Sequence, residues 1–489
     1  MIARQNNFFL VTLTFIFILL VGISAAYIPN LLLYIIAFIF ITFSTLTLIN
    51  EHNIKKITPY FLVLVLFQDT IAKLLSDSAS FITYIDELFI VITLPGAIIR
   101  LIKKGKLNNP SIVLVIGIIC FFGGVSNMIN GTPFIISVSG AFLLLKGLLC
   151  LFIFSTINYE YRDLIRLKKF IKPLLLFIVI GTFLDLIFYD TFRGILKTND
   201  SFEFRMGIIN IKSLFIHPGV YGWFMVFIGS FYAASYFILK KKIYLFSSTF
   251  FFLCSVLSFR FKVILSIIVI LSIIYLLLGV RKALILFLPT MIMSLILFIL
   301  FGDVLYSITS LTVERYLDVN IYDSARTALY VVSFLIASNE FPFGVGFGRY
   351  GGFIARENYS PVYYEYSLSN VYGLKPSDPR WATDTYWPNV IGETGFVSAF
   401  IMLIFLVYLI IKILNNYKRK HTSTDKIFLI FTALILVQSL CESLAEPIYN
   451  SSPQNIFIFA TTGIALSIIN RDKEGVRHEK KYFSNRFFP

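Results

Sequence analysis

Cationic side chains in the hydrophilic segments are the first residues of this sequence that suggest a chemical role. The guanidinium group of arginine is planar, and its paired N–H donors match the oxygens of a phosphate. Arg260 is the strongest candidate, because it lies in the short turn 258–262 between two apolar runs and has no acidic residue beside it. The alternative is that some of these cations pair with nearby acids or contact lipid headgroups. The candidates for phosphate binding are Arg205, Arg260, Lys262, Arg326, Arg349 and Arg380.

Aromatic side chains crowd residues 350–387. A flat ring covers the apolar face of a sugar, and a phenol or an indole can hydrogen-bond to its polar rim. Tyr386 and Trp387, at the end of this segment, are therefore candidates for binding a glycan. A small protein core with a belt of aromatics at the membrane surface would give the same composition, so both interpretations stay open.

The composition of the chain indicates that it is embedded in a lipid bilayer. Of the 489 residues, 57% are hydrophobic and 14% are charged, and the mean hydropathy is +0.82. A soluble protein carries roughly 25% charged residues. Length alone would suggest about three soluble domains, but apolar runs of about 17 to 25 residues, each long enough to span the hydrocarbon core, recur throughout the chain. We therefore expect one membrane domain.

The apolar runs predict an all-α polytopic membrane protein with about fourteen transmembrane helices. Helices are expected because a span must satisfy its own backbone hydrogen bonds away from water. The first run is too long for the core of a signal peptide, so we expect it to be retained. The predicted spans are 8–27, 31–49, 59–75, 81–102, 111–129, 134–157, 172–190, 213–239, 243–258, 262–279, 284–301, 391–413, 427–446 and 455–470.

The net charge of +15 is distributed as a topology signal and not as a patch for nucleic acid. Basic clusters such as Lys55–Lys56, Lys240–Lys242 and Lys418–Lys420 fall in alternate gaps between the predicted spans. Cytoplasmic loops of membrane proteins carry such an excess of Lys and Arg. With both termini in the cytoplasm, every basic cluster lies on the cytoplasmic side.

The same topology places residues 302–390 in one large periplasmic loop. This loop separates spans 1–11, in residues 1–301, from spans 12–14, in residues 391–470, and a cytoplasmic tail follows at 471–489. Loops of this length usually carry function or are disordered, and the aromatics and mixed charge argue against disorder. We expect the loop to fold, with short helices near 325–337 and just before residue 391.

Ionisable residues inside the predicted spans should be paired or functional, because an isolated charge in a bilayer is costly. Lys146 lies in the middle of a span and requires a counter-ion. Asp69 and Lys73 are spaced to satisfy each other on one helix face. Structural partners are also expected for the acids near the outer span ends, which are Asp86, Glu87, Asp185, Glu442 and Glu446.

Neither a metal nor an organic cofactor is predicted. The four cysteines lie in apolar runs without CxxC spacing, and the four histidines are scattered. His217 precedes Pro218 and Gly219, which is typical of a helix start. Residues 344–348 have the glycines of a nucleotide-binding loop but not its strand and helix, so we expect a flexible turn at the membrane surface.

Four motifs, in their order along residues 205–400, resemble those of the O-antigen polymerase and ligase superfamily of bacterial glycosyltransferases. No such motif falls in the first six spans. Asp384 stands where the ligases of that family have a histidine, which favours a polymerase. The motifs are Arg205-Met-Gly207 with His217-Pro218-Gly219, Leu257-Ser-Phe-Arg260, the stretch from Arg326 to Gly348, and Asp384-Thr-Tyr-Trp-Pro-Asn through Glu393-Thr-Gly395.

The resemblance implies joining of lipid-linked sugar repeats at the periplasmic face of the bacterial inner membrane, without a metal. The donor would be an undecaprenyl-pyrophosphate-linked glycan, and the acceptor would be the terminal sugar of a second such repeat. Arg260 and Arg326, helped by Arg205, would hold the pyrophosphate. Asp384 would activate or orient the acceptor hydroxyl, and Glu393 would brace the start of a helix. A chain-length regulator and a flippase are the expected protein partners.

Three other functions fit parts of the sequence. A ligase that moves finished polymer onto lipid A-core would lack its histidine here. A flippase for the lipid-linked repeat would not need a loop as long as 302–390, and no matching pair of interrupted helices is evident. A structural or assembly partner in the membrane would leave the outward cations unexplained.

Overall fold

The computed structural model describes residues 42–75, 77–105, 109–198, 204–205, 208–278, 324–420 and 422–487. These residues are mostly helical, and residues 340–386 consist largely of turns. The strands among them are β1 (Phe204–Arg205) and β2 (Ile208–Ile209), which pair antiparallel. The predicted spans 8–27 and 284–301, and most of 31–49, lie outside the described residues.

Seven helices of the described part are long and apolar enough to cross a membrane, and each overlaps a predicted span. The prediction of an all-α membrane protein is confirmed at this level. These helices are α3 (Glu51–Leu75), α5 (Pro110–Ile129), α6 (Phe134–Ser155), α7 (Tyr161–Ile187), α9 (Pro218–Leu239), α16 (Trp387–Tyr417) and α17 (Ser423–Glu442).

The remaining helices are of two kinds. Helices that also overlap predicted spans are α4 (Ile85–Lys104), α10 (Lys242–Val256), α11 (Phe261–Leu278) and α18 (Gln454–Phe487). Shorter helices between spans are η1 (Asp77–Tyr84), α8 (Tyr189–Ile195), α13 (Ala325–Asn339), α14 (Phe353–Glu357), α15 (Val362–Glu365) and η3 (Leu368–Asn370).

Two spanning helices begin well before their apolar stretches. α3 begins at Glu51 where a start near residue 59 was predicted, and α7 begins at Tyr161 where 172 was predicted. Lys, Arg and Glu are good helix formers, and a capping box between Glu160 and Asp163 closes the first turn of α7. Basic residues that the sequence placed in loops therefore lie on helix ends.

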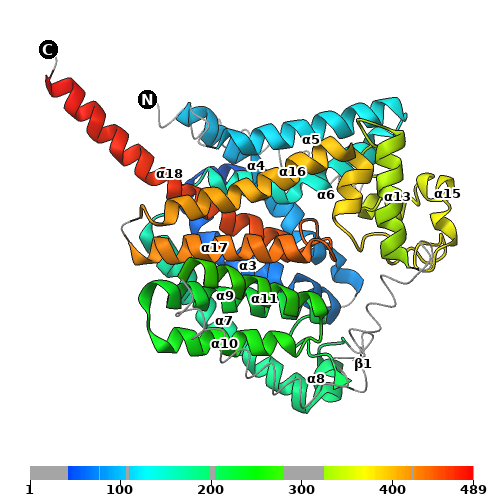
Figure 1. Ribbon diagram of the computed structural model, residues 1–489, viewed down its shortest axis with the longest axis horizontal. Coiled ribbons are helices and arrows are strands. Elements are labelled where there is room, and N and C mark those ends of the chain that lie inside the picture. Colours follow the sequence, from blue (N-terminus) through cyan, green and yellow to red (C-terminus); the bar gives the residue numbers. More distant parts are fainter. Residues whose placement is uncertain are drawn as a thin grey trace, which may run out of the picture.

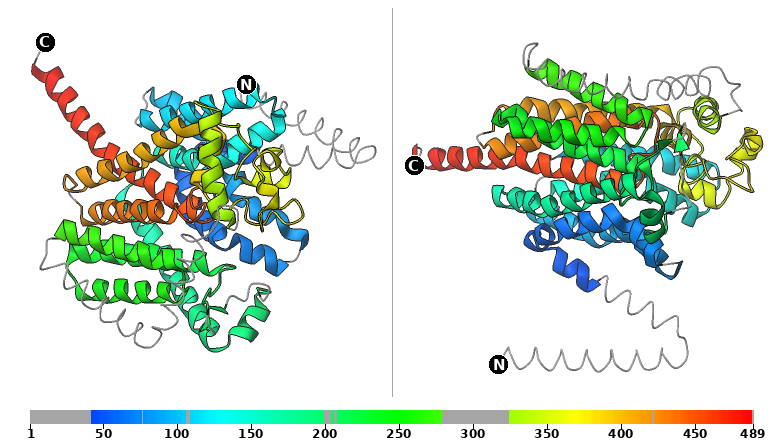
Figure 2. Two further views of the ribbon diagram at one scale, coloured as in Figure 1. Left: turned by 45° about the vertical axis from the view of Figure 1, so that its right-hand side comes forward. Right: turned by 90° about the horizontal axis from the view of Figure 1, so that it is seen from below.

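The long helices lie alongside one another, so that their ends gather at two poles of the bundle (Figures 1 and 2). At one pole, the α18 pole, α18 leaves the bundle, and the turns α9–α10 and α16–α17 lie there with Lys240–Lys242 and Lys418–Lys420. At the other, the α13 pole, α13 lies across the end of the bundle beside α16, with α15 next to it. The basic connections α9–α10 and α16–α17 therefore share one pole, as the alternation of charge predicted.

The segment from α13 to the start of α16 is folded around a small core of its own. Leu329, Val332, Tyr350, Val362 and Tyr363 are among its buried side chains. The helix expected near 325–337 is confirmed as α13. The second expected helix is the first part of α16, because Gly395 has a non-helical backbone that sets 387–394 apart from the rest.

Candidate functional site

The site is organised by a break in α16. Gly395 has φ 77° and ψ 174°, and a Cβ at this position would lie 2.4 Å from the carbonyl oxygen of Pro342. The break leaves the carbonyls of Gly392 and Glu393 without helical partners, and they accept hydrogen bonds from the N–H groups of Val345 and Gly346, both at 2.9 Å. The chain at 342–346 therefore lies directly against the broken helix.

The glycine segment Gly344–Gly348 is buried between α5, α6 and α16. The hydroxyl of Ser126, on α5, donates to the carbonyl of Gly344. The backbone of Gly348 lies so close to α6 that a Cβ on Gly140 would be 2.3 Å from the Gly348 nitrogen. The expected turn is present, but it is buried against neighbouring helices. The segment inserts between helices because its glycines allow backbone contact.

The carboxylate of Glu393 binds the end of the glycine segment. Its Oε1 accepts hydrogen bonds from the N–H groups of Gly348 at 2.9 Å, Arg349 at 3.1 Å and Tyr350 at 3.2 Å. Successive backbone N–H groups form a concave site for acceptor oxygens, and here a side-chain carboxyl group of a residue that is 2% exposed occupies it. Glu393 thus braces the glycine segment as well as its own helix.

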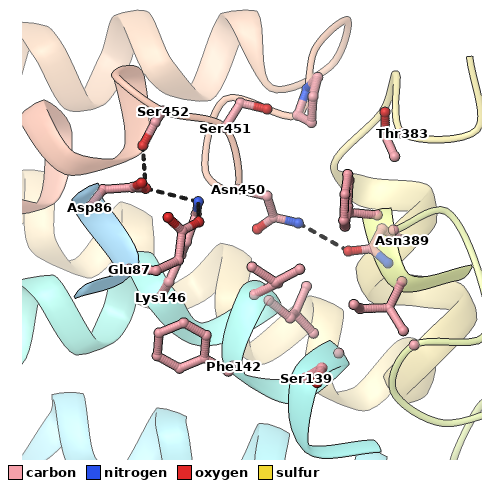
Figure 3. Close-up of a pocket in the computed structure, with 18 of the residues that line it drawn as sticks. Asp86, Glu87, Ser139, Phe142, Lys146, Thr383, Asn389, Asn450, Ser451 and Ser452 are labelled. Carbon is pink, nitrogen blue, oxygen red and sulfur yellow. Dashed lines mark hydrogen bonds and ion pairs between the residues drawn. The ribbon is translucent and has the colours of Figure 1, made fainter. Parts of the chain in front are cut away.

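A cavity of about 660 Å³ lies beside this segment (Figure 3). Its walls come from α3, α4 and α6 and from residues 348–354, 383–393 and 447–452. Its volume falls in the range of roughly 300 to 1,000 Å³ that is usual for pockets enclosing small molecules. Asp69, Asp86, Glu87, Lys146, Asn389 and Asn450 are among its polar lining residues.

Lys146 forms the ionic centre of the cavity wall. The residue is 5% exposed, and its ammonium group lies 2.9 Å from Asp86 Oδ2 and 2.6 Å from Glu87 Oε1. The Ser452 hydroxyl donates to the same Asp86 oxygen. The counter-ions that the sequence required for Lys146 are therefore two adjacent carboxylates on α4, and the expected structural partners of Asp86 and Glu87 are confirmed.

Replacing Lys146 by methionine is expected to destabilise the protein by about 3–5 kcal/mol, because it leaves two buried carboxylates without their cation. The change should lower the midpoint of thermal unfolding in detergent. Lys172→Met is the matched control, since the Lys172 side chain is exposed on α7. An unchanged midpoint for Lys146→Met would contradict the buried ion pairs.

A second cluster combines several of the cations that the sequence singled out. Arg326, at the start of α13, forms an ion pair with Asp384, and the two side chains are 25% and 41% exposed. Lys262 forms an ion pair with Glu446. The charge of Lys262 also interacts with those of Glu442, Arg260, Arg326 and Asp384. Four segments that are far apart in the sequence thus meet at this cation cluster, defined as Arg260, Lys262, Arg326, Asp384 and Glu446.

His217 connects Arg260 to the start of α9. The helix start predicted here is confirmed, and His217 caps it, with its Nδ1 accepting a hydrogen bond from the N–H of Gly219 at 3.1 Å. Its Nε2 lies 3.1 Å from Nη2 of Arg260. The residue that caps α9 therefore also positions the guanidinium group of Arg260.

The other predicted site residues are more dispersed. Arg349 is half-buried beside the glycine segment, where its Nη1 lies 3.5 Å from the Val345 carbonyl. Arg380 pairs with Asp378 on the exposed surface. The side chain of Arg205, in β1, lies outside the described part of the structure.

Tyr386 and Trp387 are both buried and pack against protein. The Tyr386 ring lies 4.9 Å from that of Tyr449, and the indole N–H of Trp387 donates to the Ser443 hydroxyl at 3.0 Å. Both rings therefore support the turn that carries Asp384.

Tyrosines of the small core have structural roles. Burial raises the pKa of Tyr350 and Tyr363 well above the usual value and that of Tyr359 to about 12. These hydroxyls stay protonated at neutral pH. Tyr350 donates to the Leu329 carbonyl and Tyr359 to the Leu374 carbonyl, both at 2.7 Å. Some of the aromatic residues in 350–387 therefore form a small protein core, which was one of the two interpretations of their crowding.

Two further cations in hydrophilic segments have buried structural partners. Arg193 pairs with Asp185 at 2.6 Å and donates to the Asn210 carbonyl at 2.8 Å. Lys212 donates to the Thr198 carbonyl at 2.7 Å. The partner expected for Asp185 is confirmed, and these cations stabilise the connection between α7 and α9.

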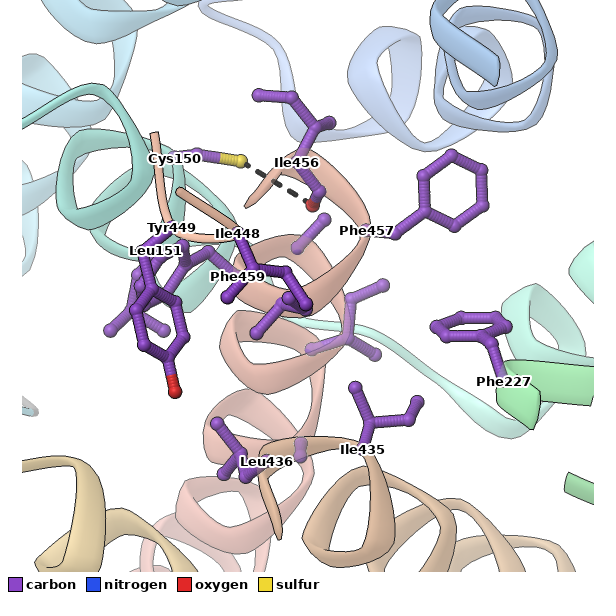
Figure 4. Close-up of a cluster of buried hydrophobic side chains, with 14 of the residues drawn as sticks. Cys150, Leu151, Phe227, Ile435, Leu436, Ile448, Tyr449, Ile456, Phe457 and Phe459 are labelled. Atoms are coloured by element: carbon purple, nitrogen blue, oxygen red, sulfur yellow. Dashed lines mark hydrogen bonds between the residues drawn. The ribbon is translucent and has the colours of Figure 1, made fainter. Parts of the chain in front are cut away.

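The cavity and the cation cluster border the same two segments. Thr383 lines the cavity and the next residue, Asp384, belongs to the cluster, while Pro447 lines the cavity and the preceding Glu446 belongs to the cluster. The second segment is held by the core through Tyr449, which Figure 4 shows among buried hydrophobic side chains. The Tyr449 hydroxyl lies 3.0 Å from that of Ser439. The two sites are therefore neighbours with fixed relative positions.

Sequence reasoning missed the cavity as a site. Its residues on α3, α4 and α6 belong to spans without a recognisable motif, and the only signal was the presence of ionisable side chains in apolar surroundings. Comparison of the sequence with protein-family models and with curated proteins gave no match.

Proposed function

We propose that this chain is an O-antigen-type polysaccharide polymerase that joins undecaprenyl-pyrophosphate-linked sugar repeats. The observation that supports this most directly is the meeting of Arg260, Lys262, Arg326 and Asp384. Three of these residues lie in motifs that resemble those of one glycosyltransferase superfamily. Cations held close together favour a ligand with several phosphate charges.

The proposed reaction is a glycosyl transfer. The acceptor hydroxyl oxygen attacks the anomeric carbon of the donor, the bond from that carbon to the pyrophosphate oxygen breaks, and the pyrophosphate leaves with the electron pair. Arg260 and Arg326 stabilise the charge that develops on the leaving group. Asp384 orients the acceptor hydroxyl or takes its proton, which then passes to water.

The orientation proposed for the membrane follows from the distribution of charge. The α18 pole, with Lys240–Lys242 and Lys418–Lys420, would face the cytoplasm. The α13 pole, with the cavity and the cation cluster, would then face the periplasm, where lipid-linked repeats are displayed. This places residues 302–390 in the periplasm and both termini in the cytoplasm of a chain with about fourteen spans.

The break in α16 favours a second candidate function, a flippase for the same lipid-linked repeat. Interrupted helices line the substrate sites of many secondary transporters, and the residues at this break reach the cavity wall through Glu393. This alternative assigns no chemical step to Asp384.

Deletion of the gene, scored by the ladder of surface glycan, tests the proposal. A polymerase deletion should leave single repeats on lipid A-core, because transfer to the core continues without chain growth. Polymer stranded on the lipid carrier would point to a ligase. Loss of surface glycan with unextended repeats retained on the cytoplasmic side would point to the flippase. An unchanged ladder would refute all three.

A further inference from the structure

We propose that the cavity is a subsite for a sugar ring that is neutral or carries an amine, and that it excludes acidic sugars. The proposal rests on the proposed function and extends it, because it states which chemical class of glycan this chain would accept. It also gives a role to α3, α4 and α6, which carry no motif.

Acceptor atoms without a protein partner point to a ligand that donates hydrogen bonds. Gln68 lines the cavity and is 3% exposed, and its amide N–H donates to the Thr83 carbonyl at 3.2 Å, so that its buried side-chain oxygen remains as an acceptor. The side-chain N–H of Asn450 donates to the side-chain oxygen of Asn389 at 3.0 Å. The amide of Asn450 is therefore also held by its nitrogen, and its oxygen remains as an acceptor. Within the described residues neither oxygen accepts a hydrogen bond. Sugar hydroxyls are donors that would satisfy both.

The charge of the wall is negative. Asp69, Asp86 and Glu87 all line the cavity, whereas Lys146 is the one Lys or Arg among its described lining residues. The Lys146 ammonium already contacts both α4 carboxylates, and Asp69 interacts electrostatically with Asp86 and Lys146. A carboxylate or phosphate on the ligand would meet this negative charge at close range, whereas a hydroxyl or an ammonium group would be stabilised.

The wall also offers an apolar surface next to these acceptors. Phe142 and Phe353 line the cavity, and Figure 3 shows Phe142 beside Glu87 and Lys146. An aromatic face beside polar acceptors suits the apolar face and polar rim of a sugar ring. Gly351 and Gly352 also line the cavity, and a Cβ on Gly351 would lie 3.0 Å from Asn389 Cα, so these glycines let the loop pack closely against α16.

The position of the cavity suits the binding of one ligand by two neighbouring parts of the site. Through the shared segments 383–384 and 446–447, the acidic cavity lies next to the cation cluster. A lipid-linked glycan has its charge on the pyrophosphate and its hydroxyl groups on the sugars. The cations would take the first part and the cavity the second, and the carboxylates of the cavity would repel the pyrophosphate.

Saturation-transfer NMR on the full chain in lipid nanodiscs tests the proposal with three probes, which are glucose, glucosamine and glucuronate at millimolar concentration. They share one ring and differ in charge. We expect glucose and glucosamine to bind, and glucuronate to bind at least about tenfold more weakly because of the carboxylates. Equal binding of glucuronate, or no binding of any probe, would overturn the proposal.

Two cavity variants and one control locate the binding. Glu87→Gln removes one negative charge and should reduce the preference for glucosamine over glucuronate. Ser139→Phe keeps every ionic contact and should abolish binding of all three probes by filling the cavity. Glu365→Gln changes an exposed glutamate of α15 and should leave binding unchanged. Undiminished binding in a folded Ser139→Phe protein would refute the site even if Glu87→Gln fails to fold.

The two proposals can fail separately. If gene deletion shortens the glycan but Ser139→Phe leaves the ladder and the sugar binding unchanged, the polymerase stands and the cavity is not its sugar subsite. If the probes bind as expected but deletion leaves the ladder intact, the cavity binds sugars in a protein with another function.

Discussion

Replacing Arg326 by alanine is expected to reduce glycan polymerisation by about 10²- to 10³-fold, because in the proposed reaction it removes a donor that stabilises the charge of the leaving group. The same change frees Asp384 from its ion partner. The ladder of a deletion strain that carries the variant should therefore look like that of the deletion itself. The amount of protein in the membrane should stay normal, since the ion pair is partly exposed.

Two further variants separate the role of charge from that of geometry. Arg326→Lys keeps the positive charge but loses the planar fork, so we expect partial activity. Arg419→Ala removes an exposed arginine at the α18 pole and should leave chain length unchanged. A normal ladder with Arg326→Ala would remove this residue from the proposed site.

Replacing Gly395 by alanine is expected to destabilise the fold by about 2–5 kcal/mol. The backbone at φ 77° would cost a residue with a Cβ about 1–2 kcal/mol. The Cβ would lie 2.4 Å from the Pro342 carbonyl oxygen and 2.8 Å from that of Phe343, and such overpacking costs about 1–3 kcal/mol more. The glycine segment would have to move away from α16, so the cavity wall should be lost with it.

Thermal unfolding in detergent measures this effect, with Gly117→Ala as the matched control. A Cβ at Gly117 meets nothing within 4 Å on α5. Alanine there should be neutral or stabilising by about 0.5–1 kcal/mol, because glycine loses more backbone freedom in a helix. Equal midpoints for Gly395→Ala and Gly117→Ala would contradict the close contact between 342–343 and the broken helix.

The positions of the spanning helices were predictable where the length of a local apolar run determines them. α5 and α6 begin within one residue of the predicted starts, because apolar length alone decides where a span lies. The starts of α3 and α7 were not predictable from apolar length. Their first turns are charged, and in α7 a capping box decides where the helix begins.

The composition of the site was partly predictable, and its contacts were not. The order of the motifs indicated Arg326 and Asp384 as members of one site, but their direct ion pair joins residues 58 positions apart. The sequence required a counter-ion for Lys146 without indicating which one. Asp86 and Glu87 serve because α4 packs against α6.

The sequence by itself determined that this is a helical membrane protein whose charged residues need partners. The reason is that the free energy of moving an apolar or a charged side chain from water into a bilayer depends on the residue type alone. Only the tertiary structure decided that Gly344–Gly348 is buried, that Glu393 binds its backbone and that an acidic cavity adjoins the cations. These features depend on a helix break at Gly395 and on close backbone contacts. Such contacts arise between segments that hydropathy and spacing treat as independent.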